Sequence, residues 1–205
     1  MEQEFSSVLL ENAVTSLSRL PGVGRKTALR FALHLLRREE NEAVGIGEAI
    51  INLRKGIRYC SVCHNISEDP VCPICASPKR RRSLVCVVES VRDVMSIEAT
   101  GRYDGVYHVL GGLISPIDGI GPDALEIGSL IDRLGDGSVE EVILATGATV
   151  EADTTDFYIY RLIQRSGANV RVTQLARGVA VGNEIEYTDE ATLARSIVDR
   201  TPFSV

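Results

Sequence analysis

The sequence predicts a multidomain α/β protein, in which a small helical unit and a cysteine-rich segment precede a parallel α/β domain. Three observations predict this. Apolar residues recur at helical spacing through roughly the first sixty positions. Four of the five cysteines follow in a stretch without periodicity, and continuous apolar runs then alternate with helix-like segments. We expect boundaries at 1–56 for the helical unit, 57–79 for the cysteine segment, 80–175 for the α/β domain and 176–205 for a C-terminal strand/helix tail.

The helical unit is expected to contain three helices. Its first apolar stripe runs from Val8 to Leu17 and stops at a proline and glycine turn, 20–24. Further stripes run from Ala28 to Leu36 and from Ile46 to Ile57. A unit of this size buries little surface, so we expect it to need a cross-link or a partner.

The cysteine segment holds two C-x2-C pairs separated by eight residues, made by Cys60, Cys63, Cys72 and Cys75. Each pair puts two thiolates on a tight turn, and this spacing lets the two turns face each other around a tetrahedral Zn²⁺ ion. Four sulfur ligands leave no position for water, so we expect one structural zinc per chain that cross-links the helical unit. Disulfides or free thiols are the alternative, although disulfides are rare in a cytoplasm.

Three further side chains could be read as ligands. His64 could replace a cysteine, but with four cysteines available we expect it to be solvated. Cys86 lies in an apolar run and is expected to be a small core residue. His108 is expected to be a solvated or capping residue.

The sequence LPGVGRKTA at 20–28 has the form of a helix-hairpin-helix motif, which binds DNA without reading its sequence. Its two glycines can take positive φ and let the backbone approach a phosphate, and the following helix offers N–H groups and the positive end of its dipole. The residues expected to contact DNA are these glycines and three nearby basic residues: Gly22, Gly24, Arg25, Lys26 and Arg30. An ordinary helical hairpin is the alternative. A P-loop is disfavoured because no glycine directly precedes Lys26 and a helix, not a strand, comes before the turn.

Four continuous apolar runs are expected to form a parallel sheet covered on both faces. They lie at 84–88, 106–110, 142–145 and 170–175, and a last helix is expected at 190–200.

Acidic residues follow the first and third of these runs, at Glu89 and in the sequence GATVEAD at 147–153. This pattern resembles the Toprim domain of topoisomerases and primases, whose metal site joins a glutamate after one strand to an aspartate pair after a later one. Here Gly147 and Thr149 stand at the two aspartate positions. Mg²⁺ needs several oxygen ligands, so we expect no metal-dependent catalysis. We expect the remaining acids to form a partner-binding surface: Glu89, Glu151 and Asp153.

Charge is unevenly distributed along the chain. Residues 1–82 hold 13 Lys and Arg against 9 Asp and Glu, a net charge of +4, so the other residues carry −10 of the total of −6. A basic first part suits phosphate and an acidic second part suits a protein partner. No stretch approaches the roughly 20 apolar residues of a membrane span, and the N-terminus is acidic, so we expect a cytoplasmic protein.

Taken in order, these signals are similar to the RecR family of recombination mediators over essentially the whole chain. The family strings LGG at 110–112 and SPIDGIGP at 115–122 are present, as is the C-terminal string from Leu175 to Pro202. The chain departs from the family at 147–148, where most relatives carry Asn-Pro, and at 152–153, where they carry Gly-Glu.

The resemblance implies a non-enzymatic DNA-repair protein that binds single- and double-stranded DNA. It implies action with RecO, and in some settings RecF, to help load RecA onto single-stranded DNA coated by single-strand-binding protein. It also implies a ring-like tetramer, in which N-terminal regions pair subunits and residues 176–205 close the ring. Two other functions stay open: a metal-dependent Toprim nuclease or primase, and an interaction module that never touches DNA.

Overall fold

The computed structural model describes residues 7–180, 182 and 184–202. The chain divides after Ile57 into two compact units, which are described one at a time. Within the described residues, no helix is long and apolar enough to cross a membrane.

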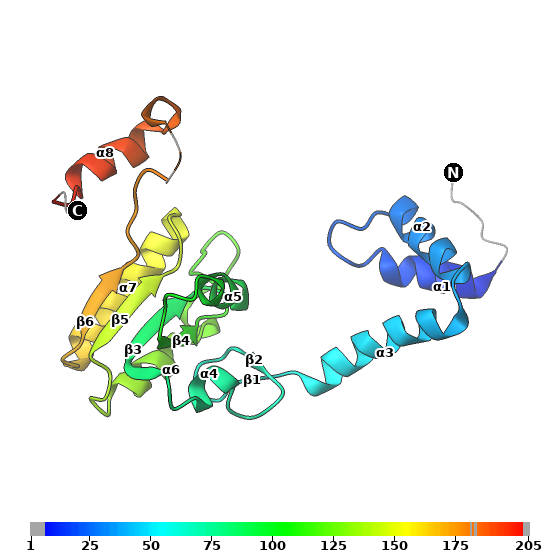
Figure 1. Cartoon of the computed structure of the whole chain (residues 1–205), viewed down its shortest axis with the longest axis horizontal. Coiled ribbons are helices and arrows are strands. Elements are labelled where there is room, and N and C mark those ends of the chain that lie inside the picture. The colour runs from blue at the N-terminus through cyan, green and yellow to red at the C-terminus, as the bar shows by residue number, and fades with distance from the viewer. Residues whose placement is uncertain (1–6, 181, 183, 203–205) are drawn as a thin grey trace. The chain divides into compact units, whose positions relative to one another are not determined.

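The described residues of the first unit form three helices, as the apolar spacing predicts: α1 (Val8–Leu17), α2 (Arg25–Leu36) and α3 (Glu40–Gly56) (Figure 1). Helices α1 and α2 pack together around Val14, Ala28 and Ala32, which are at most 5% exposed. No residue of α3 is fully buried. The core of this unit is therefore small, which agrees with the expectation from its length.

The second unit contains a parallel sheet with the strand order β4-β3-β5-β6. Its strands are β3 (Arg81–Val88), β4 (Gly105–Val109), β5 (Glu141–Ala145) and β6 (Arg171–Gln174). All four lie on the predicted apolar runs. Strand β3 begins at Arg81, three residues before the predicted run. Its first two residues are exposed arginines, which an apolar pattern does not detect.

Helices cover both faces of this sheet: α5 (Val91–Ala99), α6 (Ile127–Leu134) and α7 (Val150–Ser166) (Figure 1). Successive side chains of a strand point to opposite faces, so β3 supplies both cores. Val85 and Val87 pack in the cluster that contains the buried residues of α6 and α7, whereas Cys86 and Val88 pack in the cluster that contains Val94 of α5. The prediction that Cys86 is a core residue is confirmed.

Short elements complete the second unit. Strands β1 (Arg58–Tyr59) and β2 (Ile66–Ser67) pair antiparallel, and the single turn α4 (Pro73–Ala76) follows them. The 3-10 turns η1 (Pro122–Ala124) and η2 (Ile185–Tyr187) lie in later loops. The expected last helix is α8 (Glu190–Val198), which begins where the side chain of Asp189 accepts a hydrogen bond from the backbone N–H of Thr192.

Candidate functional sites

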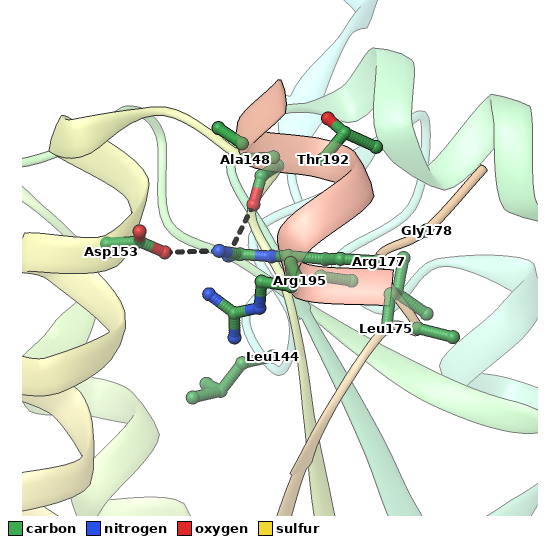
Figure 2. A pocket seen from close by; sticks show the side chains of 12 residues that line it. Leu144, Ala148, Asp153, Leu175, Arg177, Gly178, Thr192 and Arg195 are labelled. Atoms are coloured by element: carbon green, nitrogen blue, oxygen red, sulfur yellow. Dashed lines mark hydrogen bonds and ion pairs between the residues drawn. The ribbon is translucent and has the colours of Figure 1, made fainter. Parts of the chain in front are cut away.

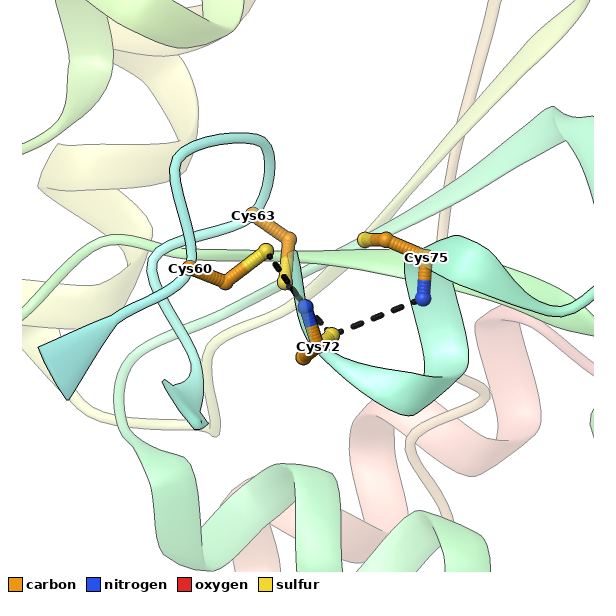
Figure 3. A group of neighbouring side chains, drawn as sticks. All are labelled: Cys60, Cys63, Cys72 and Cys75. Atoms are coloured by element: carbon orange, nitrogen blue, oxygen red, sulfur yellow. Dashed lines mark hydrogen bonds between the residues drawn. The ribbon is translucent and has the colours of Figure 1, made fainter. Parts of the chain in front are cut away.

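The four cysteines of the C-x2-C pairs form one buried cluster, called here the cysteine cluster (Figure 3). The β1–β2 hairpin carries Cys60 and Cys63, while Cys72 caps α4 and Cys75 lies within it. All four sulfur atoms lie within 4.8 Å of one another, and those of Cys63 and Cys72 are 3.6 Å apart. Tetrahedral zinc, with Zn–S bonds of about 2.3 Å, requires S···S separations of about 3.8 Å. The donor set and its spacing therefore fit a four-thiolate zinc ion.

Backbone N–H groups are arranged to favour thiolates in this cluster. The N–H of Cys72 donates to Sγ of Cys60 at 3.3 Å, and the N–H of Cys75 donates to Sγ of Cys72 at 3.4 Å. Burial is the main cause that raises the pKa of Cys72 to about 11. A divalent cation offsets this cost of burying a thiolate, so the site as built suits metal better than free thiols.

The cysteine cluster belongs to the second unit, which begins at Arg58. The carbonyl oxygen of Cys63 accepts a hydrogen bond from the N–H of Val109 in β4 at 2.8 Å, and that of Cys75 accepts one from Arg82 in β3 at 3.1 Å. The expectation that the cluster cross-links the helical unit is therefore wrong. The backbone around the cysteines is bonded to strands β3 and β4 instead.

Both histidines contact other groups: His64, expected to be solvated, is partly buried, and His108, expected to be a solvated or capping residue, is fully buried. His64 has a positive φ of 60°, and its Nε2 lies 3.0 Å from Oγ of Ser129 and 3.6 Å from a carboxylate oxygen of Glu126. His108 is fully buried, because it lies in the middle of a strand covered by α6. Its Nε2 is 2.6 Å from the carbonyl oxygen of Glu126, and the two imidazole rings meet edge to face with centroids 5.2 Å apart. Burial lowers the pKa of His108 to about 4, so it is neutral at pH 7.

The predicted hairpin joins α1 to α2. Gly22 takes a positive φ of 77°, as predicted, but Gly24 has a φ of −74° and serves as the N-cap of α2, so the expectation of positive φ is wrong for Gly24. A Cβ atom added at either glycine would meet nothing within 4 Å. The first turn of α2 also carries no acidic side chain. The turn is therefore open to an anion at the positive end of the helix dipole.

Basic side chains continue from this turn along one side of α2. They line a groove of about 380 Å³, called here the α2 groove, formed by Lys26, Leu29, Arg30, Leu33, His34 and Arg37. Two predicted DNA contacts, Lys26 and Arg30, are thus brought together, whereas Arg25 is not among the lining residues. His34 and Arg37 also line this groove and are not among the predicted contacts. His34 lies four residues after Arg30, and Arg37 lies three residues after His34, which is the spacing of side chains on one helix face.

The three predicted partner-binding acids follow two neighbouring parallel strands, β3 and β5, and differ in burial and in pairing. Glu89, at the end of β3, is half-buried, and burial followed by the charge of Asp93 raises its pKa. Glu151 is exposed in the first turn of α7, and Asp153 pairs with Arg177 at 2.5 Å. Within the described part of the chain, the cysteine cluster is the only group of three or more His, Cys, Asp or Glu side chains close enough to share a metal ion.

Comparison with known proteins decides the family. Four family models match in chain order: the RecR helix-hairpin-helix at 10–54, the RecR four-cysteine zinc finger domain at 57–77, the Toprim domain at 83–176 and the RecR C-terminal domain at 178–201. The chain is 57% identical over 205 residues to Recombination protein RecR of Parabacteroides distasonis, covering 100% of this chain and 98% of the relative. The chain belongs to the RecR family.

Other RecR proteins match over similar lengths. Recombination protein RecR of Bacteroides fragilis is 55% identical over 204 residues, covering 100% of this chain and 98% of the relative. That of Flavobacterium johnsoniae is 51% identical over 200 residues, covering 98% and 96%. Membership in the RecR family implies a role in recombinational DNA repair.

One arginine of the basic run after the RecR zinc finger, Arg80, turns toward the Toprim domain. Arg80 donates to the carboxylate of Glu98 in α5 and to the carbonyl oxygens of Tyr103 and Gly105. The hydroxyl of Tyr107 donates to the same carboxylate at 2.7 Å. The guanidinium of Arg80 is therefore engaged by groups of the Toprim domain, unlike the basic side chains that line the α2 groove.

Proposed function

We propose that this RecR-family protein is a non-enzymatic recombination mediator of the cytoplasm. It binds single- and double-stranded DNA and acts with RecO and RecF to help load RecA onto single-stranded DNA at gaps. The observation that carries this proposal is the α2 groove, which continues from an open glycine turn.

The DNA contacts in this proposal are made to phosphates. Gly22 and Gly24 leave the backbone approachable, the start of α2 is positive, and Lys26 and Arg30 share one groove. Arg25, in the first turn of the same helix, completes the proposed set. Contacts of this kind fix a protein on the sugar–phosphate chain but carry no base sequence information, which suits a mediator that must act at any gap.

The cysteine cluster holds one structural Zn²⁺ in this proposal, with Cys60, Cys63, Cys72 and Cys75 as ligands. Closed four-sulfur coordination has no open position for substrate, so the ion contributes folding free energy and no reaction step.

Glu89, Glu151 and Asp153 form the proposed surface for RecO or RecF. Of the three, Glu151 is free of the ion pair that engages Asp153 and is more exposed than Glu89. We therefore assign Glu151 the largest part in steering a basic partner surface.

A ring-like tetramer is the proposed assembly, with the C-terminal residues 176–205 closing the ring. Its N-terminal pairing is supported by α3, whose apolar side chains are largely uncovered: Ile46 is 49% exposed, Ile50 62% and Leu53 61%. These positions recur at helical spacing, so they present one apolar stripe that a second copy can bury.

The test combines binding and cleavage in one sample. The full chain, loaded with zinc, is titrated against fluorescent single- and double-stranded oligonucleotides of random sequence with and without Mg²⁺, and the DNA is then run on a denaturing gel. We expect salt-dependent binding to both forms and intact DNA. Mg²⁺-dependent cleavage would instead support the nuclease alternative, and salt-independent or undetectable binding would support the interaction module.

A further inference from the structure

The C-terminal segment places one arginine inside the Toprim domain. Arg177 follows β6, and its side chain reaches the loop between β5 and α7, where it is 17% exposed (Figure 2). One guanidinium nitrogen donates to Oδ1 of Asp153 at 2.5 Å, and the other donates to the carbonyl oxygen of Gly147 at 2.7 Å. The second nitrogen is also 3.9 Å from Oδ2 of Asp156.

Asp156 is a buried acid that needs the nearby positive charge of Arg177. Its side chain is 10% exposed, and Oδ1 accepts a hydrogen bond from the hydroxyl of Thr146 at 2.7 Å. Its Oδ2 is buried and has no hydrogen-bond partner among the described residues. Burial raises the pKa of Asp156, and the charge of Arg177 opposes that rise. A carboxylate buried in this way needs a nearby cation to remain ionised.

Arg177 contacts the β5–α7 loop at Gly147 and helix α7 at Asp153 and Asp156, in the stretch that resembles the metal-binding string of Toprim enzymes. Gly147 stands at the first aspartate position of the Toprim pattern, and Asp153 matches an acid further along the same string. Arg177 therefore bridges a carbonyl oxygen and two carboxylates, which are the hard oxygen ligands that Mg²⁺ and Mn²⁺ use.

We propose that the guanidinium of Arg177 occupies the position that a divalent cation takes in a Toprim enzyme. It supplies the positive charge that the carboxylates need and prevents a metal ion from binding there. It also ties the C-terminal segment to the β5–α7 loop. Gly147 and Thr149 supply no carboxylate at the two aspartate positions, and Arg177 balances the charges of Asp153 and Asp156.

A second arginine supplies a natural control. Both Arg177 and Arg195, which lies in α8, line a cavity of about 480 Å³. The Nε of Arg195, however, donates to Asp199 of its own helix at 3.2 Å. Figure 2 shows the two side chains from these separate segments next to each other. A loss of positive charge at Arg195 changes the potential of the cavity without removing a hydrogen bond to Asp153 or the ion pair with Asp156.

The experiment measures thermal unfolding and Mn²⁺ binding in the full-length, zinc-loaded protein and in its R177Q and R195Q variants. Mn²⁺ prefers oxygen ligands, so it does not report on the four thiolates. We expect R177Q to unfold several degrees below the parent in buffer without added divalent cations. Millimolar Mn²⁺ should restore part of that loss and give an electron-paramagnetic signal of bound ion, with neither effect in the parent or in R195Q.

A second substitution distinguishes loss of the Arg177 charge from general misfolding of the R177Q variant. D156N in the R177Q background removes the buried charge that lacks its partner, so the double variant should be more stable than R177Q and should lose the gain from Mn²⁺. If R177Q gains nothing from Mn²⁺ relative to the parent, or if the D156N change is no more favourable in R177Q than in the parent, Arg177 does not stand in a cation site and the proposal is overturned.

Discussion

The Nε2 atom of His64 lies 3.0 Å from the hydroxyl oxygen of Ser129, so the residue that follows the proposed zinc ligand Cys63 in sequence contacts helix α6 of the Toprim domain. Cys63 itself bonds β4 through its carbonyl oxygen. The structure of the cysteine cluster is therefore coupled to the structure of strand β4 and helix α6. Loss of metal should act first on the second unit and not on the helical one.

Substitution of Cys72 by serine tests the ligand assignment. Because it removes one of four sulfur ligands, we expect zinc content to fall well below one ion per chain and hydrogen exchange to accelerate in β4 and α6. Inductively coupled plasma analysis and exchange mass spectrometry measure the two effects.

Cys86 gives the matched control, because it is a buried cysteine outside the cluster. Cys86→Ala should keep the zinc content of the parent. Full zinc occupancy in Cys72→Ser would show that the assignment is wrong, and faster exchange confined to the helical unit would show that the coupling is wrong.

Reversal of two charges in the α2 groove tests the DNA site. Lys26→Glu with Arg30→Glu removes two phosphate-binding side chains and adds two repulsive charges, so binding should be nearly abolished at physiological salt. Removal of each such side chain should reduce the slope of log affinity against log salt by roughly 0.7 to 0.9. Fluorescence anisotropy over a salt series checks both values.

The control for this change is Arg161→Glu with Arg165→Glu, which alters net charge equally on exposed positions of α7. It should retain most of the affinity of the parent. Equal affinity and equal salt slope in the α2 variant and the parent, with circular dichroism unchanged, would place the DNA elsewhere.

Glu151→Lys tests the proposed partner surface. Reversal of an exposed charge should slow association with RecO or RecF by about an order of magnitude at low salt and less at high salt. Surface plasmon resonance measures the rate, and Glu48→Lys in α3 is the charge-matched control. An unchanged association rate would move the interface away from the start of α7.

The Arg80–Glu98 pair should govern the acid stability of the second unit. The hydrogen bonds from Arg80 are the main cause that lowers the pKa of Glu98, so the pair stabilises the fold above the ordinary pKa of a glutamate and the effect is lost as pH falls through the lowered value. Glu98→Gln should cost about 1–3 kcal/mol at pH 7 and less at pH 3. Urea unfolding at both values measures the difference.

Asp104→Asn is the comparison for that change, because Asp104 forms an exposed pair with the neighbouring Arg81. It should cost no more than about 1 kcal/mol. A Glu98→Gln cost that is independent of pH would mean that the pair acts through packing alone.

Much of the fold follows from local pattern. The strands lie on apolar runs because a strand covered on both faces needs apolar side chains at successive positions, as in Val85–Val88. The cysteine cluster could be predicted because the spacing of the two C-x2-C pairs lets them meet. Helix α1 could be located to its ends because its apolar stripe stops at the turn that contains Gly22.

The rest depends on contacts between distant positions. The burial of His108 follows from α6, which begins nineteen residues later. The role of Arg177 depends on Asp153 and Asp156, more than twenty positions earlier. The two-residue strands β1 and β2 are too short to show alternation. The periodicity of apolar residues does not reveal contacts between residues that are far apart in the sequence.

Strand β4 stands at the end of the strand order, and such an edge strand presents unpaired backbone groups that can recruit a strand from another chain. Here Cys63 covers the N–H of Val109, and the guanidinium of Arg133 covers the carbonyl oxygen of Tyr107 at 2.8 Å. The cysteine segment and helix α6 thus each cover one backbone group of this edge. If loss of the proposed zinc loosens the cysteine segment, the N–H of Val109 becomes available to a strand of another chain, and we expect aggregation while most of the sheet is still folded.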